Sequence, residues 1–203
     1  MTAVGKALHT YPGIAVRMPG GGMTDEQFYQ FCVLNPELRM ERTADKYILI
    51  MPPTNTDTGK RNFSLSGELY VWNKKYNLGT GFDSSTGFKL PNGADRSPDV
   101  AWIRNERWQT IPEEQKQRFA PITPDFIAEI RTGDQNIAYL KDKMEEYMSC
   151  GCRLAWLIDP KNRKTWVYYE NGDIQTISFE TPLSGGEVMP GFELRLADIF
   201  DGE

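Results

Sequence analysis

Histidine is almost absent from this 203-residue chain, which has a single copy, His9. Catalytic groups of the Ser-His-Asp or Cys-His type, and the zinc-binding helix motif with two histidines, all require this residue. His9 also lies in a segment, residues 1–23, that contains prolines and a run of three glycines and that we expect to be an extended leader. The scarcity of histidine therefore argues against these enzyme classes. No glycine-rich phosphate loop with Lys-Ser/Thr is present either.

Cysteine and long apolar runs are scarce as well. The three cysteines, Cys32, Cys150 and Cys152, have no convincing metal-binding spacing, and we expect reduced, buried thiols of a cytoplasmic protein rather than a redox pair. The longest apolar stretches, residues 47–53 and 154–158, are too short to cross a bilayer. We therefore expect no membrane partner and, since residues 1–20 lack a continuous apolar core, no secretory signal.

The composition is that of an ordinary globular protein, with 39% hydrophobic and 25% charged residues. Its length suits one sizeable core, so we expect a single domain over residues 1–203. The net charge of −5 weighs against a nucleic-acid binder, because phosphate contacts normally dominate affinity. Basic pairs at Lys60-Arg61, Lys74-Lys75 and Arg163-Lys164, and a bound divalent metal, would offset this charge locally.

Hydrophobic spacing divides the chain into short elements. We expect ordered structure to begin at Thr24, which is a good N-cap for a first helix. A second helix is expected over residues 58–77 and is stopped at Gly79, and a third is expected over residues 136–150 and is closed by Gly151. Strands are expected over residues 38–42, 47–51, 82–90, 99–103, 125–131, 154–158, 165–169 and 174–179, and residues 106–119 are expected to be partly helical. This order predicts an α/β fold: a mixed central sheet flanked by helices, with N-terminal and C-terminal β-hairpins and a parallel right-handed crossover between residues 125 and 158.

Two carboxylates stand in or beside runs that read as buried strands, where an unpaired charge is costly. Asp99 precedes an apolar run, and strand alternation places Glu129 on the same face as Asp125, Ile127 and Arg131. Such a pair on neighbouring strands would repel unless a cation or a proton intervenes. The alternative is structural: Asp99 caps a strand, and Glu129 pairs with Arg131 or Arg153.

Lys143 lies at the edge of the apolar stripe of the helix over 136–150, from where its ammonium can reach Glu129. The alternative for Lys143 is a surface lysine, and Lys141 on the other flank is a weaker candidate. Glu41 alternates with Met40 on an early strand, so a solvated face is the natural interpretation. If that strand or the helix before it lines the same cleft, Glu41 would bind a second metal or a metal-bound water.

The chain resembles the Uma-type family of restriction-endonuclease-like proteins, long classed as a domain of unknown function. The likeness extends over residues 24–200 in consistent order. The stretches that carry it are 38–43, 85–93, 96–102, 124–130, 143–147, 151, 154–160 and 190–192.

The resemblance implies a PD-(D/E)xK-type nuclease core in which Asp99 and Glu129 are the motif acids and Glu41 is the early glutamate. The motif lysine is displaced to Lys143, because Arg131 stands two residues after Glu129. The expected activity is metal-dependent endonucleolytic cleavage, leaving 5′-phosphate and 3′-hydroxyl ends. Asp99, Glu129 and the Ile130 carbonyl would hold Mg²⁺ or Mn²⁺, and Lys143 would orient the attacking water.

One departure from the family pattern concerns the loop after Glu129, which reads Thr132-Gly133-Asp134-Gln135 where the family has a Ser-Pro-Ser-Asp-like run. Alternatives therefore stay open: a nuclease-like fold that only binds nucleic acid or protein, or a hydrolase of small phosphate esters. We expect DNA as the nucleic-acid partner and, by analogy with restriction-like folds, a homodimer.

Overall fold

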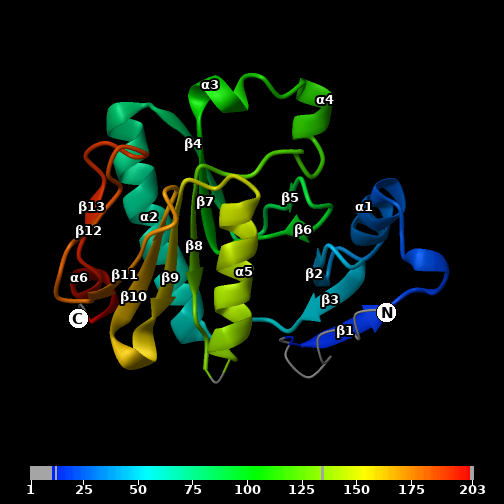
Figure 1. The fold of residues 1–203 in the computed structure, drawn as a ribbon, viewed down its shortest axis with the longest axis horizontal. Helices are drawn as coiled ribbons and strands as arrows, with labels where there is room; N and C mark the ends of the chain where they lie inside the picture. Colours follow the sequence, from blue (N-terminus) through cyan, green and yellow to red (C-terminus); the bar gives the residue numbers. More distant parts are fainter. Residues whose placement is uncertain (1–10, 12, 134, 202–203) are drawn as a thin grey trace.

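Two main β-sheets, a two-stranded pairing near the C-terminus and the surrounding helices make up the described part of the chain (Figure 1). The computed structural model describes residues 11, 13–133 and 135–201 of the 203-residue chain. A smaller sheet near the N-terminus lies at one side, and a larger sheet carries helices on both faces (Figure 1). His9 lies outside the described residues. Among the helices of the described part, none combines the length and apolar character needed to cross a bilayer.

The smaller sheet is antiparallel throughout and has the strand order β1-β3-β2-β6-β5. Its strands are β1 (Ile14–Arg17), β2 (Arg39–Arg42), β3 (Tyr47–Met51), β5 (Phe88–Lys89) and β6 (Asp95–Arg96). The predicted hairpin of β2 and β3 is confirmed, with Glu41 opposite Leu49. The expectation that ordered structure begins at Thr24 is wrong, because β1 lies within the presumed leader and pairs with β3.

The larger sheet is mixed and has the strand order β11-β10-β9-β8-β7-β4. Its strands are β4 (Gly79–Asp83), β7 (Val100–Arg104), β8 (Phe126–Ile130), β9 (Leu154–Asp159), β10 (Lys164–Tyr169) and β11 (Ile174–Ser178). Strands β8 and β9 are parallel and the other neighbours are antiparallel. The predicted strand–helix–strand unit and the C-terminal hairpin are thereby confirmed. The resulting fold is α/β with a mixed central sheet.

Two long helices cover opposite faces of this sheet. Helix α2 (Thr56–Tyr76) contributes Leu65, Leu69 and Trp72 to a core cluster that also holds Phe126, Ala128 and Ile130 of β8. Helix α5 (Ile137–Ser149) contributes Leu140, Met144 and Tyr147 to a second cluster, which holds Ile127 of the same strand. The alternation inferred for β8 is therefore confirmed, and every residue of this strand is buried.

The helix ends follow their capping residues. Thr24 and Gln27 form a capping box at the start of α1 (Asp25–Leu34), and the side chain of Asn136 caps α5. Helix α2 ends earlier than expected, because Asn77 adopts the left-handed conformation (φ 52°) and Gly79 already belongs to β4.

Three segments depart from, or refine, the predicted elements. The strand expected over 82–90 is divided between the two sheets, since β4 ends at Asp83 and β5 begins at Phe88. Residues 106–119 contain two short helices, α3 (Asn105–Trp108) and α4 (Glu113–Lys116), on either side of Pro112. The C-terminal part adds β12 (Leu183–Ser184), β13 (Glu193–Leu194) and α6 (Leu196–Phe200). The described residues also include 3-10 turns at Pro19–Gly21 and Pro160–Asn162.

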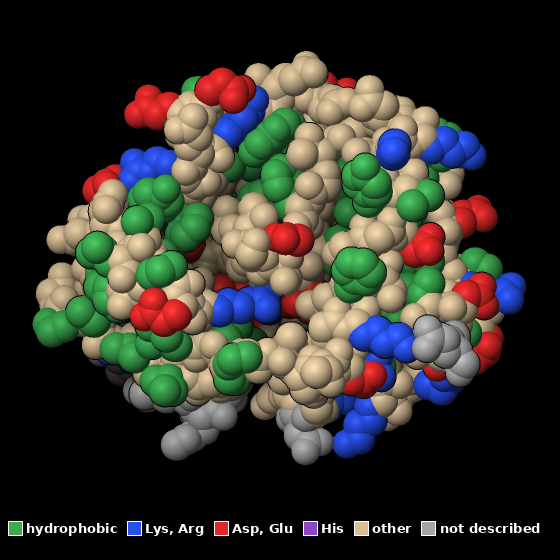
Figure 2. Space-filling model, turned by 180° about the vertical axis from the view of Figure 1, so that it is seen from behind, with side chains coloured by type: hydrophobic (Ala, Val, Ile, Leu, Met, Phe, Trp, Pro, Cys, Tyr) green, Lys and Arg blue, Asp and Glu red, His purple; other side chains and the backbone are tan. Residues whose placement is uncertain are grey.

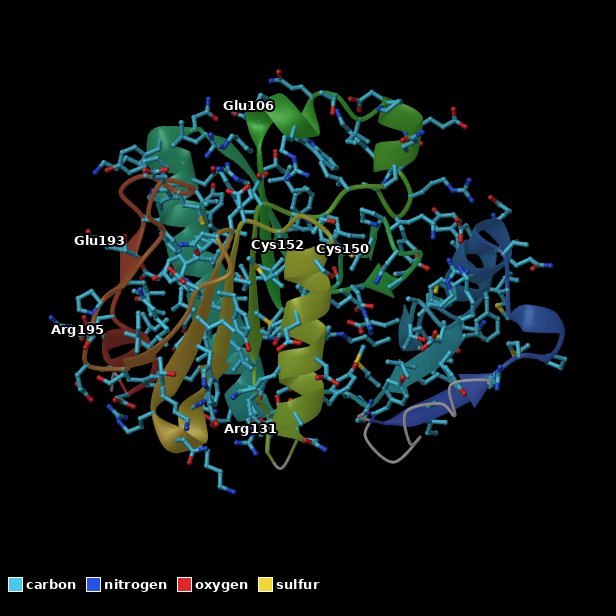
Figure 3. All side chains as sticks on the ribbon, in the orientation of Figure 1. Glu106, Arg131, Cys150, Cys152, Glu193 and Arg195 are labelled. Atoms are coloured by element: carbon cyan, nitrogen blue, oxygen red, sulfur yellow. The ribbon has the colours of Figure 1, made fainter. Side chains whose placement is uncertain are left out.

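The cysteines are free thiols. Cys150 and Cys152 lie together at one end of α5, whereas Arg131 lies toward the other end of this helix (Figure 3). Burial raises the pKa of the Cys152 thiol to about 12, so this group is held in its unreactive protonated form.

Candidate active site

A cavity of about 360 Å³ lies where the smaller sheet, the larger sheet and helix α5 meet. Its lining includes Glu41 from β2, Asp99 next to β7, Glu129 and Ile130 from β8, and Lys143 from α5. On the face shown in Figure 2 the surface is hollowed near its centre, and acidic and basic side chains meet in this hollow. The four side chains predicted from the sequence therefore reach one cavity from four separate elements.

Asp99 is held at the edge of the larger sheet by hydrogen bonds to both carboxylate oxygens. Strands β7 and β8 pair Val100 with Ala128, so Ile130 lies beyond their last residue pair. The Ile130 N–H donates instead to Asp99 Oδ2 at 2.8 Å, and Asn62 Nδ2 of α2 donates to Oδ1 at 3.2 Å. These two donors fix the carboxylate beside the cavity. Asn62 was missed in the sequence, where it reads as an ordinary polar residue of a helix.

Glu129 is buried at the centre of the site. Its Oε1 lies 2.7 Å from Lys143 Nζ and accepts a hydrogen bond from the Tyr147 hydroxyl at 3.1 Å. Burial raises the pKa of this carboxyl; Lys143 opposes the rise, but the nearby charges of Asp99 and Glu41 add to it, and the pKa reaches about 7. The site therefore carries more negative charge than Lys143 alone neutralises.

Lys143 is buried between two glutamates. Its ammonium lies 2.7 Å from Glu129 Oε1 and 2.9 Å from Glu41 Oε1, with only 6% of the side chain exposed. Burial alone would lower the lysine pKa, but the two carboxylates hold it above its usual range, so Lys143 stays charged. The alternative of a surface lysine is therefore wrong.

The alternative partners considered for Glu129 lie elsewhere. Arg131 NH1 pairs with Asp159 at 2.8 Å, and Arg153 pairs with Glu170 at 2.9 Å. Lys141, on the other flank of α5, places its ammonium over the Trp166 ring, 4.5 Å from the ring centroid. The helix position of Lys143 thus determines which lysine enters the site.

Glu41 is buried, which corrects the expectation of a solvated face. Its Oε1 accepts from Lys143 Nζ and from the Ser97 N–H at 3.1 Å, and its Oε2 accepts from Arg96 NH1 at 3.0 Å. Burial would raise the pKa of Glu41, but the Lys143 and Arg96 charges and these hydrogen bonds lower it to about 2. Both oxygens are engaged, so the geometry favours a group that holds Lys143 over a ligand for a second metal.

The charged network continues outward from Glu41. Arg96, itself buried, pairs with Glu146 of α5 at 2.6 Å, and Glu146 also accepts from the Asn92 side chain at 2.9 Å. The sequence did not point to Arg96 or Tyr147 as residues of the site. Tyr147 could have been found, because it lies one helical turn after Lys143 and therefore faces β8, which carries Glu129. Together these groups fix Glu41, Lys143 and Glu129 relative to one another.

Comparison with known proteins places this arrangement in a family. Residues 25–197 match the model of Uma2, a family described as "Putative restriction endonuclease". The chain belongs to the Uma2 family. The resemblance inferred from its motifs is thereby confirmed, and the family supports a nuclease-like function.

A solved relative shares the fold. The crystal structure of a protein from Anabaena variabilis, described as "a putative nuclease belonging to DUF820", matches with a TM-score of 0.69 and 19% sequence identity. The match covers 81% of this chain and 91% of that one. None of the curated proteins matches.

The donors of this Uma2 site suit a hard divalent cation. Asp99 and Glu129 line the same cavity, and Ile130 lines it beside them. Burial, with the charges of Asp99 and Glu41, raises the pKa of Glu129, and a bound cation would favour its ionised form. Among the described residues, no group of three or more His, Cys, Asp or Glu side chains is arranged to hold a metal. Mg²⁺ is usually bound through one or two carboxylates, with water and substrate oxygens completing its shell, so two carboxylates fit this ion.

The loop that departs from the Uma2 pattern borders the same cavity. Thr132 and Gln135 line it, and the Thr132 N–H donates to Gln135 Oε1 at 2.9 Å. Arg131 holds the base of the loop, since its Nε donates to the Gln135 carbonyl at 3.0 Å and its NH1 contacts Asp159. Asp134 lies outside the described residues. The departure therefore affects the wall of the cavity and leaves Asp99, Glu129 and Lys143 in place.

Proposed function

We propose that this protein is a metal-dependent endonuclease of the PD-(D/E)xK type that hydrolyses phosphodiester bonds of nucleic acid, with DNA as its substrate. One observation carries the proposal: a buried lysine lies 2.7 Å from Glu129 in a cavity that Asp99 also lines. A structural ion pair would not need the second carboxylate, whose charge raises the pKa of Glu129. Membership of the Uma2 family supports the same reaction class.

In this proposal Asp99, Glu129 and the Ile130 carbonyl hold Mg²⁺ or Mn²⁺. When bound, the cation supplies Lewis acidity for the attacking water and the scissile phosphate. Lys143, charged and fixed, orients that water and stabilises the negative charge that develops on the phosphate oxygens. Glu41 keeps the ammonium of Lys143 in position and Tyr147 does the same for the carboxylate of Glu129. Asn62 and the Ile130 N–H keep Asp99 aimed at the cavity.

Plasmid nicking with Mg²⁺ or Mn²⁺ tests the proposal. Asp99→Asn and Lys143→Met should each lower cleavage by at least about a hundredfold, the scale seen when one electrostatic contact to a transition state is removed. Lys141→Met and Glu145→Gln are matched controls on the same helix, because Lys141 stacks on Trp166 and Glu145 is exposed. EDTA should abolish cleavage by the wild type. Cleavage by Asp99→Asn at the wild-type rate would contradict the assignment.

A second candidate function is a binding module that no longer cleaves. The net charge of −5 and the altered loop at Thr132 and Gln135 favour it. In that case the wild type would show no cleavage with any divalent cation and would bind an oligonucleotide or, as its acidic charge favours, a protein partner. The nuclease proposal also includes a homodimer, whose mass in solution light scattering would measure. It includes a cytoplasmic location as well, and the free cysteines agree with a reducing compartment.

A further inference from the structure

A second cavity adjoins the candidate active site. Its volume is also about 360 Å³, within the range of small-ligand sites, and it shares Arg39 and Ser97 with the first cavity. Its other walls include Leu38, Ser84, Ser85 and Phe119. Ser97 ties the two together, since its N–H donates to Glu41 and its hydroxyl contacts the Ser84 carbonyl at 3.0 Å. The two cavities are therefore neighbouring parts of one surface that a continuous substrate can cover.

Arg39 stands where the two cavities meet. Alternation along β2 directs Arg39 and Glu41 toward the site, whereas Met40 packs with Phe28 of α1 and Arg42 lies over the Phe28 ring. The Arg39 side chain is 34% exposed, and its nearest charged partner is Asp99, with NH2 3.6 Å from Oδ1. This separation is too long for a hydrogen bond.

The donors of Arg39 are largely unused within the described part of the chain. Its Nε is buried and has no hydrogen-bond acceptor there. Asp83 also lies near enough to feel its charge, but Asp83 Oδ1 already accepts from the Ser85 N–H and hydroxyl. A guanidinium with free donors beside a cavity is suited to a phosphate, which accepts two parallel N–H bonds.

The second cavity suits the rest of a nucleotide better than another phosphate. Leu38, Met40 and Phe119 supply apolar surface, and Ser84 and Ser85 supply polar groups at its edge. Two carboxylates, Glu37 and Asp95, also line it, and Asp95 is paired with Arg42 and Lys89. Besides Arg39, the second cavity is lined by one basic residue, Arg96, whose side chain is already paired with Glu41 and Glu146. Apolar and aromatic surface with a few polar groups is the usual lining for a sugar and base.

We propose that Arg39 binds a phosphate of the nucleic-acid backbone at the junction of the two cavities, and that the second cavity receives the nucleotide next to the scissile phosphate. The inference rests on the proposed nuclease function and extends it to an elongated substrate. A small phosphate ester would occupy the first cavity alone. Nucleic acid has the repeating phosphates that allow both cavities to be filled at once.

The test is binding of a fluorescein-labelled single-stranded DNA oligonucleotide, measured by anisotropy with Ca²⁺ in place of Mg²⁺. Arg39→Gln should weaken binding about tenfold or more and lower the dependence on salt concentration by about one phosphate contact. Arg39→Lys should keep the salt dependence of the wild type while losing part of the affinity. Arg118→Gln is the matched control, because Arg118 is 38% exposed, pairs with Glu26 and lines neither cavity.

Ser85→Trp tests the second cavity separately. Ser85 is exposed at its edge, so the larger ring should fill the space without disturbing the core, and the oligonucleotide affinity should fall. Far-ultraviolet circular dichroism checks that each variant is folded.

The outcomes distinguish the two proposals. Equal affinities and salt slopes for Arg39→Gln and Arg118→Gln would overturn the role of Arg39, and unchanged affinity in Ser85→Trp would overturn the role of the second cavity. Both results leave the nuclease proposal standing. A wild type that binds no oligonucleotide would overturn this inference, whereas the nuclease proposal is decided by plasmid nicking.

Discussion

Replacement of Glu129 by glutamine should make the metal-free protein more stable at alkaline pH. Glu129 is buried beside Asp99 and Glu41, and these surroundings raise the pKa of its carboxyl to about 7 even though Lys143 lies 2.7 Å away. The folded state therefore holds the Glu129 proton more tightly than the unfolded state does. Glutamine has nearly the same shape, carries no charge and can still accept a hydrogen bond from Lys143.

The size of the effect follows from the two pKa values. The unfolded carboxyl has its ordinary pKa of 4.5 and the folded one about 7, which corresponds to roughly 3 kcal/mol. Between these values the folded state binds more protons than the unfolded state, so this group lowers the free energy of unfolding as the pH rises from 4.5 to 7. Above pH 7 the loss is complete, and below pH 4.5 it is absent. Glutamine does not titrate, so the variant escapes this loss.

Urea unfolding followed by circular dichroism in EDTA, from pH 4.5 to pH 8.5, measures the difference. The unfolding free energy of Glu129→Gln minus that of the wild type should grow by roughly 3 kcal/mol across this range. Glu170→Gln is the control, because Glu170 is exposed and pairs with Arg153 on the surface. A Glu129→Gln difference that stays flat with pH would refute the burial of Glu129 beside the charges of Asp99 and Glu41.

Two further predictions concern the metal and the smaller sheet. Mg²⁺ at a hundred times its dissociation constant should raise the unfolding free energy of the wild type by about 2.7 kcal/mol, an increase that EDTA reverses and that Asp99→Asn lacks; equal stabilisation of both proteins would place the ion elsewhere. Arg42 is fully buried and donates to Asp95 at 2.7 Å and to Asp25 at 2.6 Å, so Arg42→Met should cost about 3–5 kcal/mol in urea unfolding. Arg153→Met is the comparison, because Arg153 pairs with Glu170 on the surface. If both variants lose an equally small free energy of unfolding, the Arg42 network contributes little.

Much of the fold was predictable because its signals are local. The apolar run of β8, the stripe of α5 and the capping residues Thr24 and Asn136 each act within a few residues, and each produced the expected element. Strand β1 gave no such signal. It is a short edge strand whose place depends on pairing with β3, 30 to 36 residues later in the chain.

The candidate site was predictable where one element determined it. Alternation along β8 places Glu129, and the helical position of Lys143 directs its ammonium to the same face, so their contact follows from adjacent elements. The burial of Glu41 does not follow in this way, because its partners Lys143 and Arg96 are 102 and 55 residues away in the sequence. The same holds for Asn62, whose contact with Asp99 joins α2 to the residue just before β7.

The sequence by itself determined the α/β class, the parallel crossover and the candidate residues of the site, because periodicity and residue type are properties of short segments. Only the tertiary structure decided which charges share one cavity, that Glu41 holds Lys143, and that Arg39 stands between two cavities. The physical reason is that the state of a buried charge depends on its neighbours in space. Here those neighbours come from two sheets and two helices.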